Sequence, residues 1–139
     1  MRPKVNPYVE SYRQNAVLTA SPLQLVILLY DGALRFLYAA KEAMQRKDLY
    51  EQNANLQKAQ SIVSELSAGV DQQQGGELAE NLLGLYTYCY NEIVEANLGD
   101  KLENVERCIA VLSQLRESWS ELESKQRQGQ TSEDLPLAS

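Results

Sequence analysis

Apolar positions in residues 19–124 recur at intervals of three and four, the spacing of one face of an α-helix. Polar segments with turn-forming residues interrupt the pattern near residues 47, 71–76 and 97–100, which predicts four helices. No stretch alternates with the period of two expected of a half-buried strand. Helices of about 19 to 27 residues with short connections predict an all-α fold, an antiparallel up-down four-helix bundle.

Three segments carry signals for a helix start. Ser21 to Gln24 combine a capping serine, a proline at the first helical position and a glutamine that can bond back to the cap amide. Asp48 to Glu51 and Asp100 to Glu103 show the same capping-box spacing. From where the apolar period stops, we expect the first helix to end near Arg46 and the last near Ser124. The third helix is expected over about residues 77–97.

The first and third predicted helices each carry two apolar rows, whereas a surface helix in a small bundle normally shows one. The rows expected in the core are Val26, Leu29, Ala33, Phe36, Leu37, Ala40 and Met44, and Leu78, Leu82, Leu85, Cys89, Ile93 and Ala96. A second row needs another apolar surface to pack against, so we predict that it binds a partner. The candidate client-binding residues are Leu23, Ile27, Tyr30, Leu34, Tyr38, Leu83, Tyr86, Tyr90 and Val94.

The two ends of the chain lack a sustained apolar period. Residues 1–18 contain Pro3 and Pro7 and predict a flexible N-terminal arm, and residues 125–139 are polar and predict a disordered tail around a bundle of residues 19–124. Tyr8 and Tyr12 of the arm could cover the second rows as a lid. A second copy of the chain could cover them equally well, so a structural homo-oligomer is the alternative function.

Composition excludes several classes of function. The net charge is −6 and the 13 basic residues are scattered, so no nucleic acid is expected as a partner. The chain has no histidine, no Cys-x-x-Cys pair and no phosphate-binding glycine loop, so we expect no enzyme, no metal and no cofactor. The longest apolar run, Leu25 to Tyr30, is far shorter than a membrane span, and no signal peptide is visible.

Single residues also carry expectations. Cys89 and Cys108 are expected to be small buried apolar groups, which fits a reducing, cytoplasmic compartment. Asp31 lies across the first helix from its core row and precedes Gly32. The glycine indicates either a close approach by another backbone or plain tolerance, and the carboxylate is expected to bond to a partner backbone or to water.

An ordered set of motifs resembles the FliS family, the flagellin-specific export chaperones. The set begins with Tyr12, Thr19-Ala20-Ser21-Pro22, Leu25 and Leu29-Tyr30-Asp31-Gly32, and continues through Ala59, Ile62, Leu66, Asp71, Gly75-Gly76, Asn81-Leu82, Leu85-Tyr86, Tyr88 and Ala96-Asn97 to about Trp119. The last 15 residues match nothing in the family pattern.

The resemblance implies a cytoplasmic helical bundle without enzymatic activity. Such chaperones bind the C-terminal helical segment of flagellin, prevent its premature polymerisation and deliver it to the flagellar type III export gate. In the family the N-terminal arm can fold over the client groove and is implicated in contact with the gate, which here would involve Tyr12 with Tyr8 nearby. A co-chaperone or regulator and a weak homodimer stay open as further partners.

Overall fold

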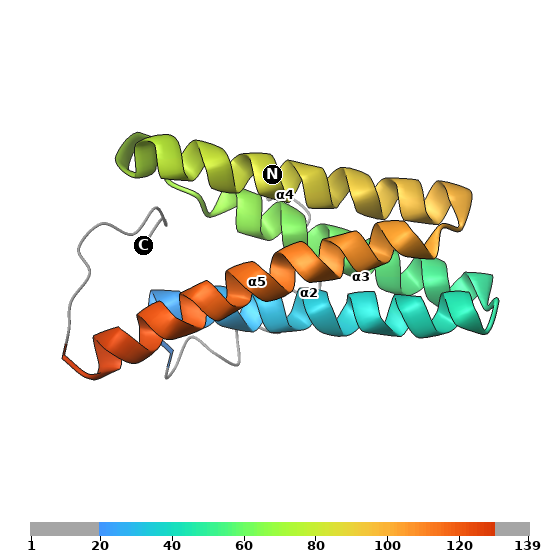
Figure 1. Cartoon of the computed structure of the whole chain (residues 1–139), viewed down its shortest axis with the longest axis horizontal. Helices are drawn as coiled ribbons and strands as arrows, with labels where there is room; N and C mark the ends of the chain where they lie inside the picture. The colour runs from blue at the N-terminus through green and yellow to red at the C-terminus, as the bar shows by residue number, and fades with distance from the viewer. Residues whose placement is uncertain (1–19, 130–139) are drawn as a thin grey trace, which may run out of the picture.

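The described part of the chain, residues 20–129 of a computed structural model, forms four α-helices (Figure 1). They are α2 (Pro22–Gln45), α3 (Leu49–Ala68), α4 (Gln72–Gly99) and α5 (Leu102–Arg127). The all-α prediction is confirmed. Figure 1 shows the chain reversing at each connection, so that α2 and α4 run one way and α3 and α5 run back. The predicted arm, with Tyr8 and Tyr12, lies outside the described residues.

The helices pack in a closed ring of neighbours. Helix α2 contacts α3 and α5, and α4 contacts the same two helices. Within residues 20–129 the backbones of α2 and α4 make no close contact, so these helices lie diagonally opposite each other. Helix α5 is therefore flanked by α2 on one side and α4 on the other.

Local capping explains where α2 and α3 begin. The Ser21 hydroxyl accepts a hydrogen bond from the Gln24 amide, and the Gln24 side chain accepts one from the Ser21 amide, which completes the predicted capping box. Asp48 caps α3 by accepting from the Glu51 amide at 3.1 Å. These bonds confirm the two predicted helix starts. Both starts were predictable because each cap involves residues only three positions apart.

The predicted cap at Asp100 is wrong. This residue ends α4 in a left-handed conformation, with φ 54°, and its carboxylate accepts a hydrogen bond from the buried Gln52 side chain of α3 at 2.8 Å. Aspartate tolerates the left-handed region better than most residues do. Helix α5 begins one position later than predicted, with Lys101 as an N-cap that makes no side-chain cap bond. The contact with Gln52 thus replaces the local cap.

Two further boundaries differ from the prediction. Asp71 caps a helical turn at Gln72, where a polar connection was expected, and Gly76 then breaks the helix with φ 54° and ψ −128°. Helix α5 continues to Arg127 rather than ending near Ser124. Lys125 and Arg127 lie in that last turn, where positive charge interacts favourably with the helix dipole.

The core is apolar and draws on all four helices. The predicted core row of α2 is buried or packed against the core, and α3 and α5 contribute apolar side chains such as Leu56, Val63 and Leu112. On α4 the prediction is wrong at two positions, since Leu78 is 52% exposed and Leu85 is 37% exposed. Tyr86, which was expected outside the core, is buried, and so is Ala79. Helix α4 is thus rotated relative to the predicted orientation.

A buried polar cluster links the diagonal helices. The hydroxyls of Tyr30 in α2 and Tyr86 in α4 share a hydrogen bond of 2.5 Å, and the indole Nε1 of Trp119 in α5 donates to the Tyr30 hydroxyl at 3.1 Å. Burial raises the pKa of the Tyr30 phenol and raises that of Tyr86 to about 12. Both phenols therefore stay protonated. Their hydrogen bond connects α2 to α4, whose backbones do not contact each other.

Helix α2 is long and apolar enough, by length and hydropathy alone, to cross a membrane. The core helix of a folded domain passes the same test. Here Leu23, Tyr30 and Leu37 are fully buried against the other helices. One third of the most apolar 18-residue stretch of α2 is buried within the bundle.

Candidate binding grooves

Three of the nine candidate client-binding residues lie in the core. Leu23, Tyr30 and Tyr86 are at most 1% exposed. The expectation that they form an open second row is therefore wrong. Tyrosine is amphipathic, and the hydroxyls of Tyr30 and Tyr86 satisfy each other inside the protein, which a row count along one helix could not show.

A second group of the candidates lies on the side of α2 that faces α5. Residues seven apart lie on the same side of an α-helix. Lys41 lies seven residues after Leu34, which lies seven after Ile27, and it pairs with Glu106 of α5 at 3.2 Å. Asp31 lies seven residues before Tyr38 and pairs with Arg116 of α5. The members of this group are Ile27, Leu34 and Tyr38, of which only Tyr38 is classed as exposed.

The remaining candidates lie on the side of α4 that faces α3. Asn97 continues the register of Leu83 and Tyr90, and its side-chain amide donates to Asn53 of α3 at 2.6 Å. Val94 lies on the same side by helix geometry. Because α2/α5 and α3/α4 are opposite sides of the ring, the structure does not bring the predicted residues together as one surface.

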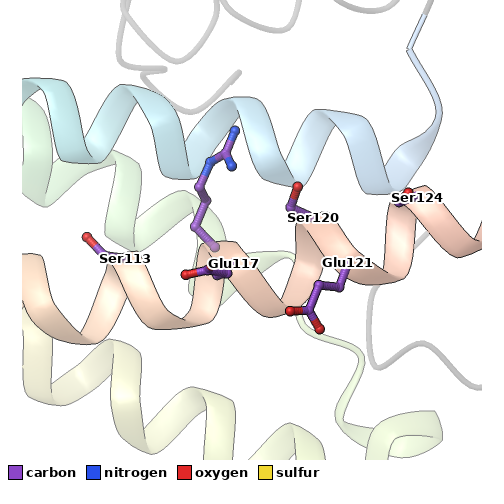
Figure 2. Close-up of a pocket in the computed structure, with 6 residues that line it drawn as sticks. Ser113, Glu117, Ser120, Glu121 and Ser124 are labelled. Carbon is purple, nitrogen blue, oxygen red and sulfur yellow. The ribbon is translucent and has the colours of Figure 1, made fainter.

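One groove runs between α2 and α5, and we call it the α2/α5 groove. Its hollow of about 330 Å³ is lined by Ala20, Gln24, Ile27, Leu28, Arg116, Ser120 and Glu123. An adjoining hollow of about 430 Å³ along α5 shares Arg116 and Ser120 and is also lined by Ser113, Glu117, Glu121 and Ser124 (Figure 2). Figure 2 shows Ser120 on the side of α5 toward α2 and Glu121 on the other edge. All six residues that line the hollow along α5 are serine, arginine or glutamate.

Asp31 has a defined partner, so neither expected partner for its carboxylate is observed. The Arg116 guanidinium donates to its two carboxylate oxygens at 2.6 and 3.3 Å, and this contact raises the pKa of Arg116. Both side chains are more than one third exposed, so the pair contributes little to stability. It joins α5 to α2 beside the α2/α5 groove.

A more apolar groove runs between α4 and α5, and we call it the α4/α5 groove. Its hollow of about 400 Å³ is lined by Leu78, Leu82, Leu115, Ser118, Trp119, Glu121, Leu122 and Lys125. Leu85 lies seven residues after Leu78 on the same side of α4. Glu92, a further seven residues on, pairs with Arg107 of α5 at 2.8 Å, so this side of α4 faces α5.

Sequence reasoning placed Leu78 and Leu85 in the core and so missed this groove. One signal could have found it. The register of these two leucines continues into Glu92, and a row that ends in a charged residue is less suited to the core than one that stays apolar. Tyr88, 40% exposed, extends the uncovered apolar surface of α4 nearby.

The described residues offer no arrangement suited to catalysis. Cys89 and Cys108 are free and buried, and the Cys108 thiol donates to the Cys89 carbonyl at 3.9 Å. Hydrogen bonding with Cys89, together with burial, raises the pKa of Cys108, so the nucleophilic thiolate is disfavoured. No group of three or more potential metal-ligating side chains occurs in residues 20–129.

Comparison with known proteins adds the family. The sequence model of the family described as "Flagellar protein FliS" matches residues 4–126. The flagellar secretion chaperone FliS of Salmonella typhimurium is 34% identical over 122 residues, which cover 87% of this chain and 90% of the relative. The Bacillus subtilis protein of the same name is 33% identical, covering 89% of this chain and 93% of its own length. The flagellar secretion chaperone FliSB of Pseudomonas aeruginosa is 35% identical over 103 residues, or 74% and 82% of the two chains.

Proposed function

Because the chain belongs to the FliS family, whose Salmonella and Bacillus members are named flagellar secretion chaperones, we propose that it binds the C-terminal helical segment of flagellin in the α4/α5 groove. The observation that carries the proposal is the uncovered apolar side of α4. Leu78 and Leu85 are both exposed on the side of α4 that faces α5, and Leu78 lines a hollow together with the partly buried Leu115 and Leu122. An amphipathic helix binds such a groove through anchors spaced along one face.

The energetics require several anchors. A fully buried leucine contributes about 1.5–3 kcal/mol, whereas ordering a flexible segment costs at least about 2–5 kcal/mol. Leu78, Leu85 and Tyr88 each keep between one third and about half of their surface exposed, and this surface is available to a client. Binding at this groove needs no chemical step, in keeping with relatives that are named chaperones.

The same proposal extends to the steps after binding. A client held in the groove would be kept from premature polymerisation in the cytoplasm and delivered to the flagellar type III export gate. The N-terminal arm, with Tyr8 and Tyr12, stays a predicted lid and gate contact. Ile27, Leu34 and Tyr38 beside α5, and Leu83, Tyr90 and Val94 beside α3, stay predicted client contacts on the other sides of the bundle.

Calorimetric titration with a flagellin C-terminal peptide tests the proposal. Half of a leucine's burial is worth about 1 kcal/mol, so Leu78→Gln and Leu85→Gln should each weaken binding about fivefold. Leu98→Gln is the matched control, because Leu98 is on the same helix and 80% exposed but lies outside the seven-residue register of Leu78, Leu85 and Glu92. Equal weakening by all three variants, or no binding by the wild type at millimolar peptide, would overturn the proposal.

The alternative, a structural homo-oligomer, uses the same exposed leucines for self-association. Sedimentation at micromolar concentration separates the two functions. A stable dimer that dissociates in the Leu78→Gln variant and does not bind the peptide would replace the chaperone proposal.

A further inference from the structure

The last turns of α5 line one side of the α4/α5 groove. Ser118, Leu122 and Lys125, which line the groove, lie four, then three residues apart on one side of α5, and Gly129 follows four residues later on that same side. Gly129 has φ 85°, the left-handed conformation with which helices commonly end and the chain reverses. Its amide donates to the Gln126 carbonyl at 3.1 Å.

The remaining chain is long enough to occupy the groove. Leu122 lies seven residues before Gly129, or about 10 Å along the helix. Leu135 follows Gly129 by six residues, which can span about 20 Å when extended. Leu135 can thus reach the level of Leu122 with slack to cross the groove, and Leu137 can reach farther.

The chemistry of the segment also complements the groove. Residues 133–137 read Glu-Asp-Leu-Pro-Leu, two acidic residues followed by two leucines around a proline that favours an extended backbone. The groove offers apolar walls and Lys125, which forms no ion pair with another side chain in residues 20–129. Arg127 beside it is paired with Glu123 at 2.7 Å. Glu121 is the one acidic lining residue.

We propose that residues 130–139 fold back into the α4/α5 groove, with Leu135 and Leu137 against its apolar walls and Glu133 and Asp134 near Lys125. The segment is an intramolecular occupant of the groove that a client has to displace. A flexible tether gives an effective concentration in the millimolar range, so even a weak contact fills the groove part of the time. The docking depends only on the groove, whereas its effect on client affinity rests on the proposed function.

The only tryptophan of the chain reports on this contact. Trp119 lines the groove and is 7% exposed. The full-length variant Leu135→Gln/Leu137→Gln should raise the acrylamide quenching constant of Trp119 about twofold, as expected when a half-populated contact is lost. The control Thr131→Gln/Ser132→Gln introduces the same side chains without removing a leucine and should leave quenching unchanged. A synthetic peptide of residues 130–139, added at millimolar concentration, should reverse the effect in the leucine variant.

Equal quenching in the wild type and the leucine variant would overturn the proposal. So would quenching that falls as protein concentration rises and is unaffected by the leucine changes, because the occupant would then be a second copy of the chain. No flagellin is present in this assay. Failure of the flagellin peptide to bind, with the quenching difference intact, would therefore count against the proposed function alone.

Discussion

Replacing Tyr30 with phenylalanine removes one oxygen atom that two other buried groups use. The Trp119 indole donates to this oxygen, and the Tyr86 hydroxyl shares a hydrogen bond with it. All three side chains are buried, so water does not readily replace the lost partner. Leaving a buried polar group unpaired costs about 1–3 kcal/mol, and two such groups predict a loss of about 2–6 kcal/mol in the free energy of unfolding.

Tyr86→Phe is the matched comparison because it removes the other oxygen of the same hydrogen bond. The Tyr30 hydroxyl then keeps its contact with Trp119, and only one hydrogen bond is lost. The expected loss is about 0.5–1.5 kcal/mol, no more than half of that for Tyr30→Phe. In the double variant the unpaired Tyr86 hydroxyl is also gone, so the double variant should be less destabilised than the sum of the single variants.

Urea unfolding followed by far-ultraviolet circular dichroism measures these differences without relying on Trp119 fluorescence. Tyr38→Phe provides a baseline because Tyr38 is half exposed and its hydroxyl can bond to water. The reasoning would be refuted if Tyr86→Phe cost as much as Tyr30→Phe, or if the two losses were additive in the double variant. Either result would mean that Tyr30 is not the hub of the cluster.

Other predictions concern pH and two glycines. Burial raises the pKa of Tyr86 to about 12, whereas an unfolded tyrosine titrates near 10. Between these values the unfolded state releases a proton that the folded state keeps, so this group should lower stability by about 1.4 kcal/mol per pH unit as pH rises. Urea midpoints at pH 9 and 11 should therefore fall less for Tyr86→Phe than for the wild type. Gly84 lies inside α4 with open space around it, and Gly84→Ala should raise stability by about 1 kcal/mol. Gly76→Ala should lower stability by at least about 1 kcal/mol because φ is 54° there, and calorimetric melting shifts of the same sign in both variants would contradict the assignment.

Features set by nearby residues could be predicted from the sequence. Ser21 and Asp48 cap the helices that their spacing indicated, because each cap involves a residue three positions away. The apolar period located all four helices and the core side of α2. The family resemblance covered nearly the whole bundle because its motifs are distributed along these same helices.

Features set by distant residues could not be predicted in this way. Both rows of α4 are apolar, so its rotation depends on tertiary contacts, among them the hydrogen bond between Tyr86 and Tyr30, 56 residues away. Asp100 likewise accepts a hydrogen bond from Gln52 instead of capping α5 as its local sequence pattern predicted. The pairing of helices into a ring, which separates the predicted client residues onto different sides, depends on tertiary packing throughout.

The position of α5 between α2 and α4 has a consequence for how the bundle would respond to a guest. Helix α5 forms one wall of the α2/α5 groove and one wall of the α4/α5 groove. A sideways shift of α5 that widens one groove therefore narrows the other. Guests on the two sides would then share a single coupling free energy, and each would change the affinity for the other by the same factor.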